Sequence, residues 1–254
     1  MTLLEAREIS KRFGGIMALD RVSLSVDAGE AVGLVGPNGA GKTTLFNCLL
    51  GMLRPDSGRV TFKGTDLSRL PIHRRARLGI GRTFQRVELF AEMTVREHLL
   101  VAERTRRGDG GLISDLLNQG RPRPDEQARA QAVIDLLALD GEADLPVESL
   151  SLGHARLVEL GRALMTEPDL LLLDEPSSGL DRVESLALAG ILDTVRRERA
   201  TAVLLVEHDL EMVQRVATRL YVLDFGSVLA SGPVGEVLGD HRVRRAYLGQ
   251  GVGP

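Results

Sequence analysis

The chain has 254 residues, of which 43% are hydrophobic and 26% are charged. This ordinary globular composition suits one large domain, or a core with a subdomain. The net charge of −3 argues against nucleic acid as a partner, and no apolar run is long enough to cross a bilayer.

The order of apolar runs along the chain predicts an α/β domain with a helical insertion. The first ten residues lack the basic start and apolar middle of a signal peptide. Strands are predicted at residues 3–9, 22–26, 31–35, 60–62, 170–173, 202–206 and 220–223, with helical stretches between them. Only helical patterns occur between residues 94 and 165, at 95–104, 126–139 and 155–165.

These patterns divide the chain into a core and a subdomain. We expect an ATP-binding α/β core at residues 1–90 and 166–254, and a helical subdomain at 91–165. The stretch 105–124 is rich in Gly, Pro and Arg, which favours a flexible surface loop without chemistry, with one short helix around 113–117.

Residues 36–44 read GPNGAGKTT, a phosphate-binding loop between a predicted strand and a predicted helix that continues to residue 52. Its glycines let backbone N–H groups and the helix N-terminus surround phosphate oxygens. Lys42 would bridge the β- and γ-phosphates, Thr43 would bind Mg²⁺, and Thr44 would reach the α-phosphate. A glycine-rich turn before a core helix is the alternative, disfavoured because every motif position is filled. The predicted ATP-binding residues of the loop are Gly36, Pro37, Asn38, Gly39, Ala40, Gly41, Lys42, Thr43 and Thr44.

A cysteine, a glutamine and an arginine cluster after this loop each allow a prediction. Cys48 is the only cysteine, which excludes an intramolecular disulfide, favours a reducing cytoplasm and, beside Leu49 in the helix, indicates core packing. Gln85 is an uncharged residue that could coordinate Mg²⁺ or orient water, although one glutamine says little by itself. A local arginine cluster is interpreted as a solvated face; its members are Arg74, Arg75, Arg77, Arg82 and Arg86.

Two acids close the apolar strand LLLLDE at residues 170–175. Asp174 is predicted to serve Mg²⁺, through water, and Glu175 to be the general base for attack of water on the γ-phosphoryl group. The alternative is that both acids only cap the next helix. His208 follows the apolar strand at 202–206 and could bond to the γ-phosphate and sense its departure, although a histidine at a strand end is usually structural.

Together these motifs resemble the ATPase subunits of ABC transporters over essentially the whole chain. The family's signature segment occurs as LSLGHARLVELGRAL at 150–164, its D-loop as SGLD at 178–181, and its switch histidine as His208. The resemblance makes Gln85 the Q-loop glutamine and Phe13 the aromatic that stacks on adenine, whereas the alternative for Phe13 is an ordinary core residue. It also implies a P-loop NTPase core with a mostly parallel sheet, an antiparallel β subdomain and the inserted helical subdomain.

The family further implies a head-to-tail dimer that sandwiches ATP between one phosphate loop and the other subunit's signature. Ser151, Leu152, Gly153 and His154 would then act in trans, at the N-terminus of a helix beginning near His154, while Ser178 and Asp181 form the D-loop. Leu152 and His154 replace the usual Gly and Gln. A titratable His154 could weaken the trans contacts or make them pH-dependent, and so impair one composite site.

Residues 82–102 and 232–249 are similar to the branched-chain amino-acid importer (LivG-like) group of these ATPases. That similarity implies transmembrane permease subunits, a second ATPase subunit, and indirectly an extracytoplasmic solute-binding protein. A heterodimer is favoured over a homodimer, peripheral to the cytoplasmic face of the inner membrane. The residues that would receive a permease helix, or else pack the core of the insert, are Val87, Leu89, Phe90 and Met93.

The function implied is ATP hydrolysis, with ATP and Mg²⁺ as cofactors, coupled to uptake of branched-chain or related amino acids. Uptake of another small polar solute, such as urea or amides, stays open. A soluble ABC ATPase without a membrane partner is the second class, disfavoured by the short single-ATPase length. A regulatory subunit without turnover is disfavoured because Lys42, Asp174, Glu175 and His208 are all present.

Overall fold

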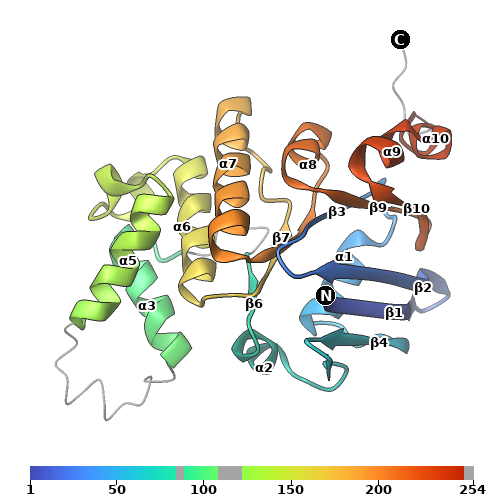
Figure 1. Cartoon of the computed structure of the whole chain (residues 1–254), viewed down its shortest axis with the longest axis horizontal. Helices are drawn as coiled ribbons and strands as arrows, with labels where there is room; N and C mark the ends of the chain where they lie inside the picture. The colour runs from blue at the N-terminus through green and yellow to red at the C-terminus, as the bar shows by residue number, and fades with distance from the viewer. Residues whose placement is uncertain (84–88, 108–121, 249–254) are drawn as a thin grey trace.

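A computed structural model describes residues 1–83, 89–107 and 122–248 of the chain. The chain forms two sheets, whose strands lie mostly in the right-hand part of Figure 1, and most helices flank the larger sheet. The strands are β1 (Thr2–Phe13), β2 (Ile16–Asp27), β3 (Ala31–Val35), β4 (Ser57–Phe62), β5 (Thr65–Asp66), β6 (Ile80–Arg82), β7 (Leu170–Asp174), β8 (Ala202–Val206), β9 (Arg219–Asp224) and β10 (Ser227–Pro233). The α-helices are α1 (Lys42–Leu50), α2 (Ile72–Arg77), α3 (Val95–Arg107), α5 (Pro124–Leu136), α6 (Leu152–Met165), α7 (Arg182–Arg199), α8 (Leu210–Val216), α9 (Val234–Gly239) and α10 (His241–Leu248).

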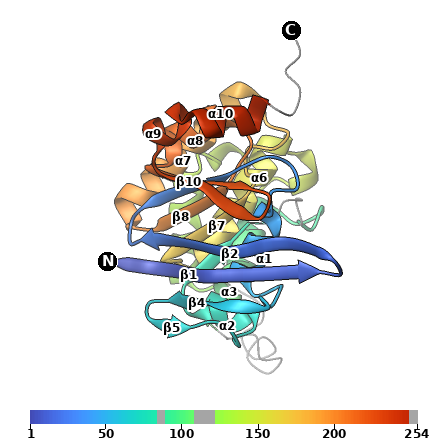
Figure 2. The ribbon, with the colours of Figure 1, turned by 90° about the vertical axis from the view of Figure 1, so that its right-hand side faces the viewer.

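The larger sheet has the strand order β10-β9-β3-β8-β7-β6. Its inner pairs are parallel, and only β10 at the edge runs antiparallel. The smaller sheet, β2-β1-β4-β5, is antiparallel throughout and lies beneath the larger one in Figure 2. The predicted mostly parallel core with an antiparallel β subdomain is therefore confirmed.

The larger sheet separates two hydrophobic cores. Val32 and Leu34 of β3 face the core formed with α1 and the antiparallel sheet. Ala31 and Val35 face the other core, which contains α7, α8 and the helices of the insertion. Strands covered on both faces need apolar residues at every position, which is why β3, β7 and β8 appear in the sequence as unbroken apolar runs.

Helices α3, α5 and α6 pack together in a lobe beside the sheets, on the left in Figure 1. Within the described part of residues 94–165 there is no strand, only an isolated bridge from Thr94 to Pro146 and the short 3₁₀ turns Asp140–Glu142 and Val147–Ser149. The proposed limits of the subdomain, 91–165, stay a prediction. The short helix expected at 113–117 and most of the loop 105–124 lie outside the described residues. No helix in the described ranges is both long and apolar enough to pass through a bilayer.

Several elements differ from the sequence-based expectation. Strands β5, β6 and β10 are additional to the predicted ones, and β1 and β2 are 12 residues each. Irregular register between them, with Glu8 and Arg21 at positive φ, breaks the alternation that would have revealed their length.

The solvated-face interpretation is wrong for Arg75. This residue is 4% exposed, and its guanidinium donates hydrogen bonds to the carbonyls of Cys48, Leu49, Leu67 and Leu70. It closes the C-terminal end of α1, where carbonyl groups lack helical partners. Cys48 is fully buried in the same helix, so its predicted core position is confirmed.

Candidate active site

The phosphate loop follows β3 and passes through a space that only glycine backbone fits. A Cβ on Gly36 would lie 2.2 Å from the carbonyl oxygen of Leu223, and one on Gly41 would lie 2.6 Å from that of Ala18. Gly41 also has φ 102°, a conformation that other residues rarely adopt. Helix α1 begins at the next residue, so its free N–H groups face the loop.

Lys42 lies inside this loop rather than extending from it. Its Nζ donates hydrogen bonds to the carbonyl oxygens of Gly36 at 2.6 Å and Pro37 at 3.0 Å, and the residue is 6% exposed. Burial lowers the pKa of Lys42, while the carboxylates of Glu175 and Asp174 act in the opposite direction. The loop thus concentrates one positive charge and several N–H donors, the combination that binds phosphate. Thr43 is exposed and Thr44 half-buried on the first turn of α1.

Strands β7 and β8 are parallel neighbours, and they bring Glu175 and His208 together. Asp174 pairs with Val206 in the register, and the N–H of Glu175 bonds to the Val206 carbonyl at 2.9 Å. His208 Nε2 is 2.7 Å from Glu175 Oε1. This pairing places the two side chains predicted to work on the γ-phosphate in direct contact.

Asp174 lies close to two other acids, Glu175 and Glu207. Burial, and then the carboxylates of Glu175 and Glu207, raise the pKa of Asp174 to about 6 against the opposing charges of His208 and Lys42. Such crowding of carboxylates disfavours ionisation until a cation balances it.

These residues fit the requirements of Mg²⁺. Thr43 offers an exposed hydroxyl oxygen and Asp174 a carboxylate, both hard oxygen donors. Among the described side chains no three of His, Cys, Asp or Glu cluster as a complete metal site. Magnesium in nucleotide sites is usually held by one or two protein oxygens together with phosphates, which agrees with this donor set.

Glu207 is a site residue that the sequence reasoning missed. It is 2% exposed, and its carboxylate accepts hydrogen bonds from the N–H of Ser177 at 2.8 Å and the N–H of His208 at 3.0 Å. Glu207 therefore connects the segment after β7 to His208. The sequence does carry a signal for it: Glu207 directly follows the apolar strand 202–206, just as Asp174 and Glu175 close the apolar strand 170–173.

The signature helix α6 begins at Leu152, two residues before the predicted start at His154. Ser151 is its N-cap, because the Ser151 hydroxyl accepts a hydrogen bond from the His154 N–H at 3.1 Å. His154 points toward the insertion itself, with Nδ1 3.0 Å from Glu142 Oε1. Leu152 remains 47% exposed.

Within the subunit, the signature and D-loop segments pack against each other. A Cβ on Gly153 would lie 2.4 Å from Glu184 Oε1, and one on Gly179 would lie 2.9 Å from a methyl group of Leu152. Asp181 is the N-cap of α7 in a capping box with Glu184. Ser178 is exposed, and its N–H bonds to the Glu175 carbonyl at 3.0 Å.

The remaining predicted site residues are separate from this cluster or undescribed. Phe13 ends β1 at the tip of the β1–β2 hairpin with 46% exposure, so its reading as a core residue is wrong, and the stacking role stays a prediction. Lys11 Nζ lies 5.6 Å from the centroid of its ring. Gln85 and Val87 lie outside the described residues.

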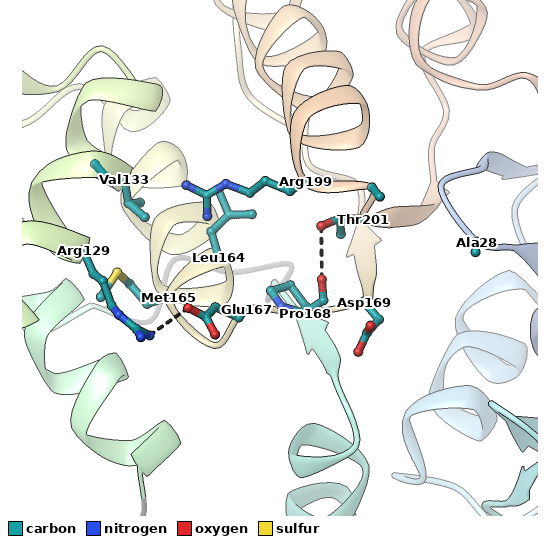
Figure 3. A pocket seen from close by; sticks show the side chains of 12 residues that line it. Ala28, Arg129, Val133, Leu164, Met165, Glu167, Pro168, Asp169, Arg199 and Thr201 are labelled. Atoms are coloured by element: carbon teal, nitrogen blue, oxygen red, sulfur yellow. Dashed lines mark hydrogen bonds and ion pairs between the residues drawn. The ribbon is translucent and has the colours of Figure 1, made fainter. Parts of the chain in front are cut away.

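A large cavity lies away from these residues (Figure 3). It has a volume of about 630 Å³ and is bordered by the residues that precede β7 and β8, including Pro168, Thr201 and the Arg129–Glu167 ion pair. Asp174 and His208 follow the opposite ends of the same strands. The cavity is therefore at the boundary of core and helical lobe, on the far edge of the sheet from the phosphate loop.

Comparison with known proteins agrees with the site. The sequence profile described as "ABC transporter" matches residues 19–178. The chain is 40% identical over 251 residues to the high-affinity branched-chain amino acid transport ATP-binding protein LivG of Salmonella typhimurium, covering 98% of each chain. It is 35% identical over 250 residues to the lipopolysaccharide export system ATP-binding protein LptB of Haemophilus influenzae, again covering 98% of each.

Among solved structures, the ADP conformation of MJ1267, an ATP-binding cassette of an ABC transporter, superposes with a TM-score of 0.86. The identity is 32%, and the alignment covers 98% of this chain and 100% of MJ1267. Full-length similarity at these levels, together with the phosphate loop and the acids beside it, leads to one conclusion. The chain belongs to the ABC transporter family and is an ATP-binding ABC-type ATPase.

Proposed function

We propose that this chain is the ATP-hydrolysing subunit of an importer for branched-chain or chemically related amino acids. The observation that supports hydrolysis most directly is the 2.7 Å contact between Glu175 and His208, beside the loop that holds Lys42. The similarity to LivG over nearly the whole chain supports the class of solute.

In this proposal the residues around Lys42 bind the phosphates and those at the strand ends act on water. Loop N–H groups and Lys42 hold the β- and γ-phosphates and stabilise the charge that develops there. Glu175 accepts a proton from the attacking water, and His208 orients Glu175 through the contact between them. Thr43, Gln85 and Asp174 would hold Mg²⁺, the last through water, and the cation would balance phosphate charge. Phe13 would stack on the adenine ring.

A second ATPase subunit would complete each nucleotide site. Ser151, Leu152, Gly153 and His154 lie at or beside the N-terminus of α6, where a helix favours an anion such as the γ-phosphate of the opposing subunit. Ser178 and Asp181 would form the D-loop contact across the same interface. We favour a heterodimer, as in the importer group that the sequence resembles.

The permease would dock in a groove between the core and the helical lobe. This groove of about 230 Å³ is bordered by α2, β6, α3 and α6. Ile72 and Val101 supply exposed apolar surface at 36% and 46%, and Phe90 is 67% exposed. Leu89, by contrast, packs against the hydrophobic core. Docking here would place the subunit on the cytoplasmic face of the inner membrane, with the solute-binding protein reached only through the permease.

The catalytic assignments are tested by two variants of the purified chain. Glu175→Gln should retain ATP binding and lose most hydrolysis, because the amide cannot accept the proton. Lys42→Ala should weaken both. Full turnover in Glu175→Gln would contradict the general-base assignment, whereas loss of ATP binding in that variant would show that it damages the site rather than the chemistry.

The transport assignment is tested by purifying the tagged chain with its partners from gently solubilised membranes. Two permeases and a second ATPase should co-purify, and the complex reconstituted in vesicles should take up labelled leucine with ATP. Uptake of urea or an amide instead would replace the solute class, and recovery of soluble partners alone would favour a non-transport ATPase.

A further inference from the structure

A very small cavity lies where three segments of the ATP site meet. Its volume available to the centre of a water molecule is about 10 Å³. Thr83 borders it from the end of β6, Arg156 and Glu159 from α6, and Leu173 and Pro176 from either side of the two catalytic acids. The space is therefore large enough for one water molecule and for little else.

Two of the residues that border this cavity each carry a buried polar atom without a partner. Thr83 Oγ1 and Arg156 Nε each expose less than 1 Å² and, within the described residues, make no hydrogen bond. Buried groups of this kind are strongly destabilising unless a protein atom or an ordered water satisfies them. Glu159, a residue that is 5% exposed, borders the same cavity.

We propose that one ordered water molecule occupies this cavity and joins Thr83, which follows β6 and leads into the Q-loop, to the signature helix α6. The Arg156 Nε–H donates to the water oxygen, and the water donates one proton to Thr83 Oγ1 and the other toward Glu159. Three partners are typical for a buried water. Each orphaned atom then has a partner, and Thr83 and Arg156 become positioning residues for ATP hydrolysis.

The backbone connections of these residues explain why the water matters for the site. The Thr83 N–H donates a hydrogen bond to the Leu172 carbonyl at 3.2 Å, so the segment that follows β6 is attached to β7. Arg156 lies five residues after the N-cap Ser151, within the second turn of α6. The water adds a polar link between them, so its loss would weaken the positioning of α6 beside Asp174 and Glu175. This role depends on the ATPase site and not on the solute or the permease.

Thr83→Val tests the proposal because valine keeps the shape of threonine and removes only the hydroxyl. Its matched control is Thr201→Val, since Thr201 is 2% exposed and donates to the Pro168 carbonyl at 3.1 Å, at the far edge of the sheet. Both variants should melt roughly 2–6 °C below the unmodified chain. Only Thr83→Val should lose ATPase activity. Its kcat should fall by about tenfold, with KM for ATP little changed, as is typical when a residue that positions active-site groups is lost.

Thr83→Ser keeps the hydroxyl and should restore both melting temperature and kcat. If Thr83→Val melts at a higher temperature than the unmodified chain, the Thr83 hydroxyl has no water partner in the native protein, and the proposal is overturned. Unchanged kcat in a destabilised Thr83→Val would overturn the positioning role.

A crystal structure of the unmodified chain gives a test that does not depend on any variant folding. At a resolution of about 2 Å or better, a water should appear within about 3.2 Å of both Thr83 Oγ1 and Arg156 Nε. An empty cavity, or a direct hydrogen bond between the two side chains, would overturn the proposal.

Discussion

Replacing Arg75 by methionine should destabilise the protein strongly, although the residue belongs to an arginine-rich helix that the sequence alone suggests is solvent-exposed. The guanidinium makes four hydrogen bonds to main-chain carbonyls, at 2.6–3.1 Å. Methionine retains most of the length of the side chain and its packing but offers no donor. The change therefore isolates the hydrogen bonds that hold the C-terminal end of α1.

The magnitude follows from which carbonyls have a second donor. Those of Cys48 and Leu67 also accept backbone bonds from Gly51 and Leu70, whereas those of Leu49 and Leu70 have only Arg75 within the described residues. An unpaired carbonyl costs about 1–3 kcal/mol when it is buried, as that of Leu49 is, and less when it is half-buried, as that of Leu70 is. Removing a buried charge offsets part of this cost, so we expect a net loss of about 3 kcal/mol, or roughly 6–12 °C in melting temperature.

Scanning calorimetry of Arg75→Met beside Arg74→Met and Arg77→Met measures this difference. Arg74 and Arg77 are exposed neighbours in α2, and each control should stay within about 0.5 kcal/mol of the unmodified chain. If Arg75→Met melts with the controls, the guanidinium does not hold α1 in solution, and the reasoning from its hydrogen bonds fails.

Three further predictions concern other buried or capping groups. Burial raises the pKa of the Cys48 thiol to about 11, so native protein at pH 8 should react with iodoacetamide about a hundredfold more slowly than urea-unfolded protein. Because the folded state holds this proton more tightly, the thiol's contribution to stability is complete below about pH 9 and is lost as the pH rises through 11. The melting temperature of the unmodified chain should therefore fall relative to that of Cys48→Val when both are measured from about pH 9 to 11. Asp181→Ala removes the N-cap of α7 and should cost about 1 kcal/mol by urea unfolding, while Asp181→Asn should cost less. Glu207→Gln replaces one of two acceptor oxygens with an NH₂ group that faces an N–H, so kcat should fall through displacement of His208 even where ATP binding persists; an unchanged kcat would separate Glu207 from the site.

The parts of the fold that could be predicted are those whose cause lies in neighbouring residues. The phosphate loop is specified within nine consecutive positions, and the doubly covered strands β3, β7 and β8 within five each. Their order then placed Glu175 and His208 at one edge of the sheet, because parallel strands present their carboxyl ends together.

The parts that failed depend on groups distant in the sequence. Arg75 is buried because α1 ends 25 residues earlier with unpaired carbonyls, a match that no local pattern reports. Glu207 acquires its role only when β8 lies beside β7, which brings the N–H of Ser177 to its carboxylate. Helix α6 begins two residues before the predicted start because the Ser151 hydroxyl caps it by accepting a hydrogen bond from the His154 N–H.

The division of the protein by its larger sheet has a consequence for how the sequence can change. Successive residues of β7, Leu170 to Leu173, contribute alternately to the two cores. A substitution that enlarges one residue can therefore be compensated by its second neighbour along the strand but not by its first. In a library of paired substitutions in β7, the tolerated pairs should be those at positions two apart. The two faces of the strand can therefore change independently of each other.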